Sequence, residues 1–331
     1  MADKIRNGKL RYDSQNTTVV LDSLYKSSLT DSGGINEFHI GQNSIENAVA
    51  RSSLSLSGRN TFTAEARESA LDASTLTFNH AGNTVILSGR EDALDESKLT
   101  LKGGDNTLTL NGGEGAVSES RITFSGLGNT VEISGREDAL DESRITAKGN
   151  DTFSLSGKTV MDESVLSVKG GNNSITLTGT VALEKSSITT GGGQDTLAIA
   201  GSMFKGKINT GAGDDAITVT GALASSSITA GNGNDSVSVT GSLSKSTVNA
   251  GHGDNVVDID GSLLSSTLSA GNGNDVISVT GSATQSKVTA GNGDNAVTID
   301  GALSSSTLTT GKGLDTVFID GGVGKSKINT G

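Results

Sequence analysis

The chain has 331 residues, with 46 glycines, no cysteine, no proline, no tryptophan and only 3% aromatic residues. Too few large side chains are present to fill the core of a helical or doubly wound enzyme, and the lack of cysteine excludes a disulfide framework. The formal net charge of −12 argues against a nucleic-acid partner, whose phosphates require a basic face. No segment approaches the roughly 18 consecutive apolar residues of a membrane span, so none is predicted.

The N-terminal part of the chain, to about residue 190, repeats a coil of 22 to 24 residues. Each coil has an asparagine, or at Asp151 an aspartate, followed by an alternating strand such as residues 85–88, with Val85 and Leu87 on one face. A long charged corner follows, and residues 89–97 and 135–143 have the same sequence, Gly-Arg-Glu-Asp-Ala-Leu-Asp-Glu-Ser. These corners are interpreted either as solvated turns with weak local ion pairs or as a partner-binding edge.

The C-terminal part of the chain has shorter corners and a period of 20 residues. Its turns run from Gly211 to Asp215, with equivalents beginning at Gly231, Gly251, Gly271, Gly291 and Gly311. A glycine follows the last turn position by six residues, which predicts a corner with positive φ. A serine also recurs in all but one coil from Ser74 to Ser326, and predicts a second polar column beside the Asn/Asp column.

The repeat predicts the fold class, because a unit of this length cannot bury its own apolar face and stacked copies can. We expect an all-β protein, a single parallel β-solenoid (β-roll or β-helix) of about fifteen coils with 20–24 residues per coil. Residues 1–190 form the part with longer charged corners and an asparagine column. Residues 191–331 continue the solenoid with 20-residue coils and Gly-x-Gly-x-Asp turns.

The turns of residues 190–331 resemble the calcium-binding repeats of secreted bacterial RTX proteins, whose pattern is Gly-Gly-x-Gly-x-Asp-x-apolar-x. The matching segments include Thr210–Ile217 and Ala230–Val237. The resemblance implies Ca²⁺ held between neighbouring turns by aspartate carboxylates and backbone carbonyls, a hard-oxygen donor set that suits this ion. The implied metal ligands are Asp195, Asp215, Asp235, Asp275 and Asp315, with Asp214, Asp254 and Asp294 in support.

The resemblance is incomplete in ways that affect the expected sites. The first glycine of the family pattern is Thr or Ala here, and only one of the two turns per coil has the motif. In two coils the order is inverted, to Asp254-Asn255 and Asp294-Asn295, so alternate coils are expected to bind calcium weakly or not at all.

The function implied by the resemblance is a non-enzymatic, secreted structural or adhesive segment of a bacterial cell surface or matrix, stabilised by calcium. No catalytic residue is predicted, since His39, His80 and His252 are far apart along the coils. One alternative is a calcium-independent filament, matrix or surface-layer subunit that self-associates end to end through open solenoid edges. An ice-binding or carbohydrate-active β-helix is a further alternative, although Lys287 and Lys327 interrupt the threonine column of Thr247, Thr267 and Thr307.

Overall fold

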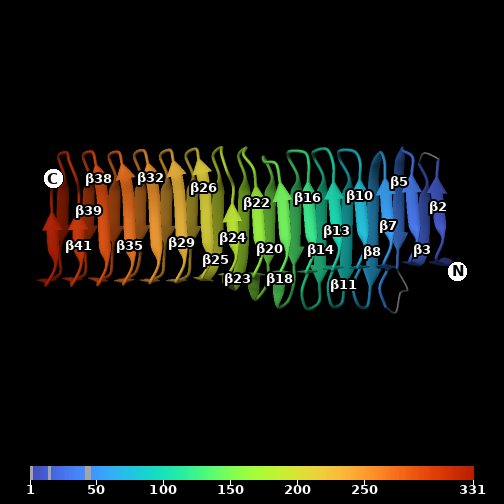
Figure 1. Ribbon diagram of the computed structural model, residues 1–331, viewed down its shortest axis with the longest axis horizontal. Coiled ribbons are helices and arrows are strands. Elements are labelled where there is room, and N and C mark those ends of the chain that lie inside the picture. Colours follow the sequence, from blue (N-terminus) through green and yellow to red (C-terminus); the bar gives the residue numbers. More distant parts are fainter. Residues whose placement is uncertain (1–2, 14–15, 42–45) are drawn as a thin grey trace. The chain divides into compact units, whose positions relative to one another are not determined.

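The computed structural model describes residues 3–13, 16–41 and 46–331. Its regular structure in these ranges consists of parallel β-strands stacked as a solenoid of about 15 turns, with no helix, which confirms the predicted fold class (Figure 1). No helix in the described ranges is long and apolar enough to cross a membrane. The contacts divide the chain into two compact units, residues 1–169 and 170–331, called unit 1 and unit 2 below. The predicted change of coil type near residue 190 stays a prediction.

Unit 1 repeats three strand positions per coil: a first strand, a short corner strand and a second strand. β1 (Asp3–Arg6) lies at the corner position, because it pairs with the last residues of β3 (Thr18–Tyr25), a strand that includes both the first-strand and the corner positions. The first strands are β3, β5 (Ile35–Ile40), β8 (Arg59–Ala66), β11 (Thr84–Gly89), β14 (Thr107–Gly112), β17 (Thr130–Ser134) and β20 (Thr152–Ser156). The corner strands are β6 (Val49–Ala50), β9 (Leu71–Asp72), β12 (Leu94–Asp95), β15 (Val117–Ser118), β18 (Asp138–Asp141) and β21 (Thr159–Asp162). The second strands are β2 (Lys9–Tyr12), β4 (Ser28–Asp31), β7 (Ser53–Leu56), β10 (Thr75–Phe78), β13 (Lys98–Leu101), β16 (Arg121–Phe124), β19 (Arg144–Ala147) and β22 (Val165–Val168).

Unit 2 follows the same plan, but its first two coils merge the first strand with the corner strand. The first strands are β23 (Ser174–Glu184), β25 (Thr196–Phe204), β27 (Ala216–Val219), β30 (Ser236–Val239), β33 (Val256–Ile259), β36 (Val276–Val279), β39 (Ala296–Ile299) and β42 (Thr316–Ile319). The corner strands are β28 (Leu223–Ala224), β31 (Leu243–Ser244), β34 (Leu263–Leu264), β37 (Ala283–Thr284), β40 (Leu303–Ser304) and β43 (Val323–Gly324). The second strands are β24 (Ser187–Thr189), β26 (Lys207–Ala212), β29 (Ser227–Asn232), β32 (Thr247–His252), β35 (Thr267–Asn272), β38 (Lys287–Asn292), β41 (Thr307–Thr309) and β44 (Lys327–Asn329).

Strands of successive coils pair in register, so equivalent residues lie directly above one another. In unit 2, Val237 pairs with Val257, and Val257 pairs with Ile277. Side chains alternate between the two faces of a strand, so this column is buried from Ile217 to Val297 and becomes half-buried only at Val317 in the last coil. The core of each unit is therefore a set of stacked apolar columns rather than one central cluster.

The two units fill their cores differently. In unit 1, Phe38, Phe62 and Phe78 are fully buried, and their neighbouring rings lie 6.0 to 6.4 Å apart between centroids. In unit 2, the residue before the glycine-rich turn is small, as at Ala250 and Ala270, and is fully buried. Small side chains there leave room for polar side chains to enter the solenoid beside the turn.

The corner glycines are present for a reason other than the one predicted. Among the glycines of this series, only Gly201 has the expected positive φ. At Gly241, a Cβ atom would lie 2.6 Å from the backbone N of Ala222 and from the carbonyl O of Gly221 in the preceding coil. The corner thus requires glycine for close backbone approach. The left-handed conformation instead occurs just before each column serine, as at Lys245 (φ 51°).

The serine column is confirmed as a chain of buried hydrogen bonds. Ser246 Oγ accepts from the backbone N–H of Ser226 at 3.1 Å and donates to the carbonyls of Leu223 and Ser244 at 3.0 and 2.9 Å. The next serine, Ser266, repeats the pattern by accepting from the N–H of Ser246. Each hydroxyl therefore ties its own corner to the neighbouring coil.

Replacing Ser246 with alanine is expected to lower the free energy of unfolding of unit 2 by about 1–3 kcal/mol, because the buried N–H of Ser226 loses its acceptor. Chemical denaturation followed by circular dichroism measures this change. Ser244→Ala, at the neighbouring position of the same corner, is the control, because its hydroxyl makes no hydrogen bond among the described residues. Equal stability of the two variants would contradict a structural role for the column.

Candidate functional site

The candidate site is the pair of polar columns at the glycine-rich turns of unit 2. The inner column holds the last residue of each turn and is buried except in the last coil, where Asp315 is half-buried. Its members are Asn173, Asp195, Asp215, Asp235, Asn255, Asp275, Asn295 and Asp315. The outer column holds the residue before each of these. It includes the exposed Asp214, Asp254 and Asp294.

One side-chain oxygen of each inner residue is used to join two coils. Oδ1 of Asp235 accepts from the backbone N–H of Asp215 at 2.9 Å, and Oδ1 of Asn255 accepts from that of Asp235 at 3.0 Å. The same bond recurs along the column from Asn173 to Asp315, at 2.8 to 3.0 Å. Asparagine and aspartate serve equally well for this bond, since both provide the acceptor oxygen.

The other atom of the side chain distinguishes the two residue types. Asn255 Nδ2 donates to the carbonyls of Gly253 at 2.8 Å and Ala270 at 3.1 Å. Asn295 Nδ2 donates to the carbonyls of Gly293 at 2.9 Å and Thr310 at 3.3 Å. This end of an inner side chain therefore lies among backbone carbonyl oxygens, which attract a donor or a cation.

An aspartate places a second oxygen in that environment. Oδ2 of Asp195, Asp235 and Asp275 is buried and has no hydrogen-bond partner within the described ranges. Asn255 Nδ2 contacts the carbonyls of Gly253 and Ala270. One repeat of 20 residues earlier, the equivalent carbonyls beside Asp235 are those of Gly233 and Ala250. A carboxylate oxygen among carbonyl oxygens is strongly unfavourable unless a proton or a cation lies between them.

The ionisation of the inner aspartates responds to this environment. Burial raises the pKa of Asp235 to about 6, and repulsion by Asp215 and Asp214 adds to the rise. The hydrogen bond from the Asp215 N–H lowers this pKa but does not offset the effect of burial. Burial likewise raises the pKa of Asp215 and of Asp275. The folded chain thus disfavours bare carboxylates at Asp215, Asp235 and Asp275. In the last coil, the effect of burial on Asp315 is outweighed by hydrogen bonds from Thr310 and Asn295, which lower the pKa of this carboxyl.

The outer aspartates predicted as supporting ligands are placed differently. Asp214 Oδ1 accepts from the backbone N–H of Asn234 at 2.8 Å, and Asp254 Oδ1 accepts from that of Asn274 at 2.7 Å. Inner and outer acids therefore lie in separate columns, one buried and one exposed. In the inverted coils, the exchange of Asp and Asn moves the charge outward and leaves an amide inside.

The donor set available to a cation combines carboxylate and carbonyl oxygens. Within the described residues, no three His, Cys, Asp or Glu side chains gather as a metal-binding group. Backbone carbonyls of the turns would therefore have to supply most ligands of any bound ion. Calcium accepts six to eight such hard oxygens with irregular geometry, and the buried, unpartnered Oδ2 atoms fit this chemistry.

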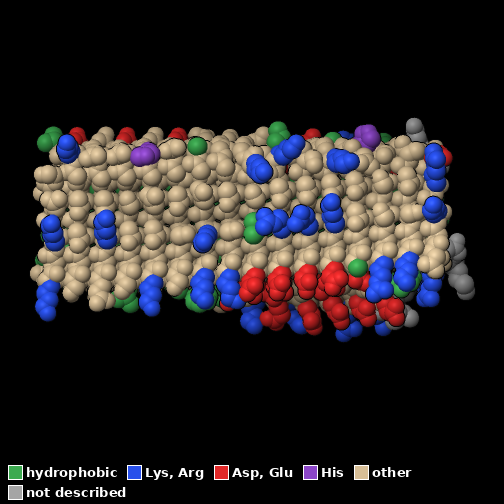
Figure 2. Space-filling model, in the orientation of Figure 1, with side chains coloured by type: hydrophobic (Ala, Val, Ile, Leu, Met, Phe, Trp, Pro, Cys, Tyr) green, Lys and Arg blue, Asp and Glu red, His purple; other side chains and the backbone are tan. Residues whose placement is uncertain are grey.

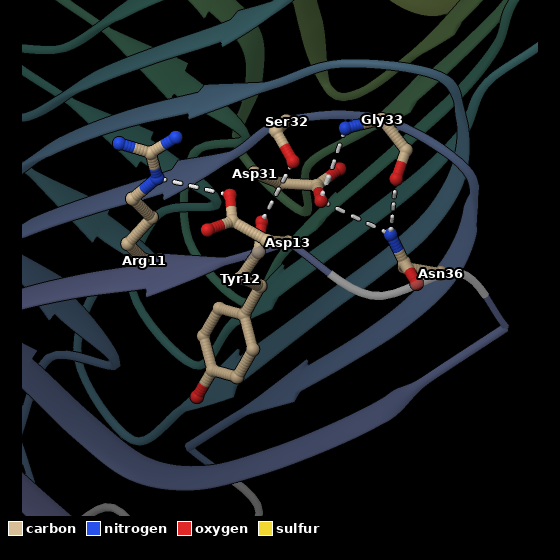
Figure 3. Close-up of polar contacts among 7 residues, drawn as sticks. All are labelled: Arg11, Tyr12, Asp13, Asp31, Ser32, Gly33 and Asn36. Atoms are coloured by element: carbon tan, nitrogen blue, oxygen red, sulfur yellow. Dashed lines mark hydrogen bonds and ion pairs between the residues drawn. The ribbon is translucent and has the colours of Figure 1, made fainter.

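One buried acid was missed by the sequence reasoning. Asp31, at the end of β4 in unit 1, is 1% exposed, and its Oδ1 accepts from Asn36 Nδ2 at 3.1 Å (Figure 3). Its Oδ2 has no hydrogen-bond partner in the part of the chain that is described. Nearby, Arg11 and Ser32 hold the pKa of Asp13 below its usual value by hydrogen bonding at the surface. Asp31 lies outside the Gly-x-Gly-x-Asp pattern, so no sequence signal marked it.

The charged corners of unit 1 form a strip of acids. Asp72 pairs with Asp95, and Asp141 pairs with Asp162, while the corner glutamates lie in a neighbouring column; Figure 2 shows the acidic row. Burial, and then repulsion by Asp95 and Glu91, raises the pKa of Asp92 to about 6. Lys158 pairs with Glu137 at 3.0 Å at one of these corners. The acids therefore mainly face one another.

This arrangement makes the stability of unit 1 depend on pH. The folded pKa of Asp92 is above the unfolded value of about 3.9, so its contribution is complete below pH 4 and lost as the pH rises through 6. Thermal unfolding in chelator should show a midpoint that falls over this window, with Tyr12 and Tyr25, the only tyrosines, as the unit 1 probe. Asp92→Asn should flatten the profile, and an unchanged slope in that variant would contradict the assignment.

Comparisons with known proteins add no family to this description: no family model, curated protein or solved structure matches the chain. The fold itself defines the class, a parallel β-solenoid repeat protein. The likeness to RTX repeats therefore rests on the turn residues alone.

Proposed function

We propose that the chain is a non-enzymatic structural or adhesive β-solenoid segment, extracellular in location, whose unit 2 binds calcium at the inner aspartates. The observation that supports calcium binding is the set of buried Oδ2 atoms at Asp195, Asp235 and Asp275, which have no hydrogen-bond partner among the described residues. The extracellular and adhesive parts of the proposal rest on the resemblance to RTX repeats.

The proposed role of calcium is to complete folding of unit 2. Without the ion, an ionised inner aspartate opposes burial, and protonation near neutral pH only partly relieves this cost. Calcium would place positive charge between Oδ2 and the turn carbonyls, so that the folded state binds the ion and the unfolded chain does not. A ligand at 100 times its dissociation constant stabilises the folded state by about 2.7 kcal/mol per independent site.

Equilibrium dialysis of the full chain against calcium tests the proposal directly. We expect more than one ion bound per chain at the free calcium concentration of an extracellular medium. Hydrogen exchange should show calcium-dependent protection of the turns that end at Asp195, Asp235 and Asp275. Absence of binding under these conditions would overturn the proposal.

A calcium-independent scaffold is the second candidate, and one observation favours it. The bond from backbone N–H to Oδ1 is made at both asparagine and aspartate positions, in unit 1 as well as in unit 2. If the unfolding curves in calcium and in chelator coincide, hydrogen-bonded columns alone hold the coils together. The solenoid would then act as a metal-free structural element.

A further inference from the structure

A basic face on the second strands of unit 1 stands out in a chain of net charge −12. Lys98 pairs directly with Arg121, and Arg121 pairs with Arg144, so three exposed cations are stacked in one column of β13, β16 and β19. A second column beyond the strand ends contains Lys102, Lys148 and Lys169, all exposed. Figure 2 shows these rows of basic side chains on the face that presents β13 and β16 in Figure 1.

A threonine column lies between the two rows of cations. Thr100 pairs with Thr123, and Thr123 pairs with Thr146, and all three are half-buried on the same outward side of the strands. Lys98 and Lys102 are four residues apart, which corresponds to about 13 Å along an extended strand. The face is thus a track of hydroxyls bordered on one side by an unbroken column of three cations and on the other by a row of lysines that Ser125 interrupts.

The fold does not require these cations. Adjacent coils are about 4.8 Å apart, so stacked like charges repel one another and destabilise the strand pairing. The same column holds Ser53 and Thr75 in earlier coils of unit 1, where neutral side chains meet the same backbone. Within the described ranges, no ion pair involves Lys98, Arg121 or Arg144. The repulsion among these three cations destabilises the strand pairing, and no ion pair among the described residues compensates for it. Such an arrangement indicates a role in binding a ligand.

The shape and surroundings of the face select the ligand. Glu96, Glu119 and Glu142 each lie two residues before a cation of the first column and border the track with negative charge. That border disfavours a wide, densely charged duplex and leaves room for a narrow chain. The outward side chains of the track include no aromatic ring on which nucleic-acid bases could stack. Arginine binds carboxylates in bidentate fashion, and threonine hydroxyls match sugar hydroxyls.

We propose that this basic face binds a linear anionic polysaccharide of the polyuronate class, laid across the coils. One carboxylate per sugar meets one cation per coil, because a uronic acid residue advances its chain by about the rise of one coil. The threonine column hydrogen-bonds the sugar hydroxyls between the two rows of cations. This site is in unit 1 and does not depend on calcium binding in unit 2.

The test uses the full chain in chelator, so that calcium cannot bridge the polymer to acidic side chains. Fluorescence anisotropy with a labelled oligogalacturonate should show binding at low salt that weakens steeply as salt is added. The triple variant Lys98→Thr, Arg121→Thr and Arg144→Thr should bind at least about tenfold more weakly, and it should fold because Thr75 occupies the same column. The matched control is Arg67→Thr, Arg90→Thr and Arg136→Thr, which makes the same charge change at the acidic corners.

Three results would overturn the proposal. The first is no binding by the unchanged chain at low salt. The second is an equal loss of affinity in both triple variants, which would assign binding to net charge rather than to this face. The third is evidence that a different partner occupies the face. Equal competition by a single-stranded oligonucleotide would assign the face to nucleic acid, and a dimer in sedimentation that only the Lys98, Arg121 and Arg144 variant dissociates would assign it to a second copy.

Discussion

Replacing Asp235 and Asp275 together with asparagine is expected to remove up to about 5 kcal/mol of calcium-dependent stabilisation from unit 2, if two independent sites are saturated. The variant should nevertheless be at least as stable as the unchanged chain in chelator. Asn255 and Asn295 show that an amide at this position accepts the backbone N–H bond at Oδ1 and also donates from Nδ2 to turn carbonyls. Thermal unfolding by circular dichroism, in calcium and in chelator, measures both effects.

The matched control for this pair is Asp258→Asn with Asp300→Asn. Both residues are exposed, Asp258 in β33 and Asp300 directly after β39, so the control makes the same charge change away from the inner column. It should keep the full calcium response. Identical responses in the two double variants would mean that calcium acts through general charge screening, and the inner column would lose its role as a calcium site.

Replacing Gly251 with alanine is expected to destabilise unit 2 by about 3 kcal/mol or more. Its φ of 106° is a conformation that costs a residue with a Cβ atom about 1–3 kcal/mol. The added Cβ would also collide with the carbonyl of Gly231, a backbone atom held by strand pairing in the preceding coil. For a unit of this size, the loss corresponds to a fall in the unfolding midpoint of about 6–12 °C.

Gly192→Ala is the control for the backbone prediction. A Cβ at Gly192 would make only an ordinary contact, 3.6 Å from the Ala212 carbonyl, and φ is not in the left-handed region. This variant should change the midpoint little. Hydrogen exchange by mass spectrometry should place the loss of protection in Gly251→Ala within unit 2. If the unfolding midpoints of Gly251→Ala and Gly192→Ala are similar, the coils can move apart to accommodate the added Cβ without loss of stability, and the prediction is wrong.

The architecture could be predicted from the repeat period and the apolar pattern. A repeat of 20 residues with alternating apolar positions cannot bury its apolar side chains alone, and it buries them when equivalent residues of successive coils stack. The positions of the serine and Asn/Asp columns followed from the same period, because in-register pairing places equivalent side chains one above another. The choice of aspartates as candidate ligands also followed from the turn pattern.

Tertiary structure alone decided which oxygens of those aspartates are available. Asp214 and Asp215 are adjacent acids in the same turn, and the conformation of that turn buries Asp215 and exposes Asp214. The unpartnered state of Oδ2 at Asp235, in the described part of the chain, depends on the adjoining turn. The reason for glycine at Gly241 likewise depends on the backbone of the preceding coil. These properties arise between coils, and a local pattern cannot encode the distance from one coil to the next.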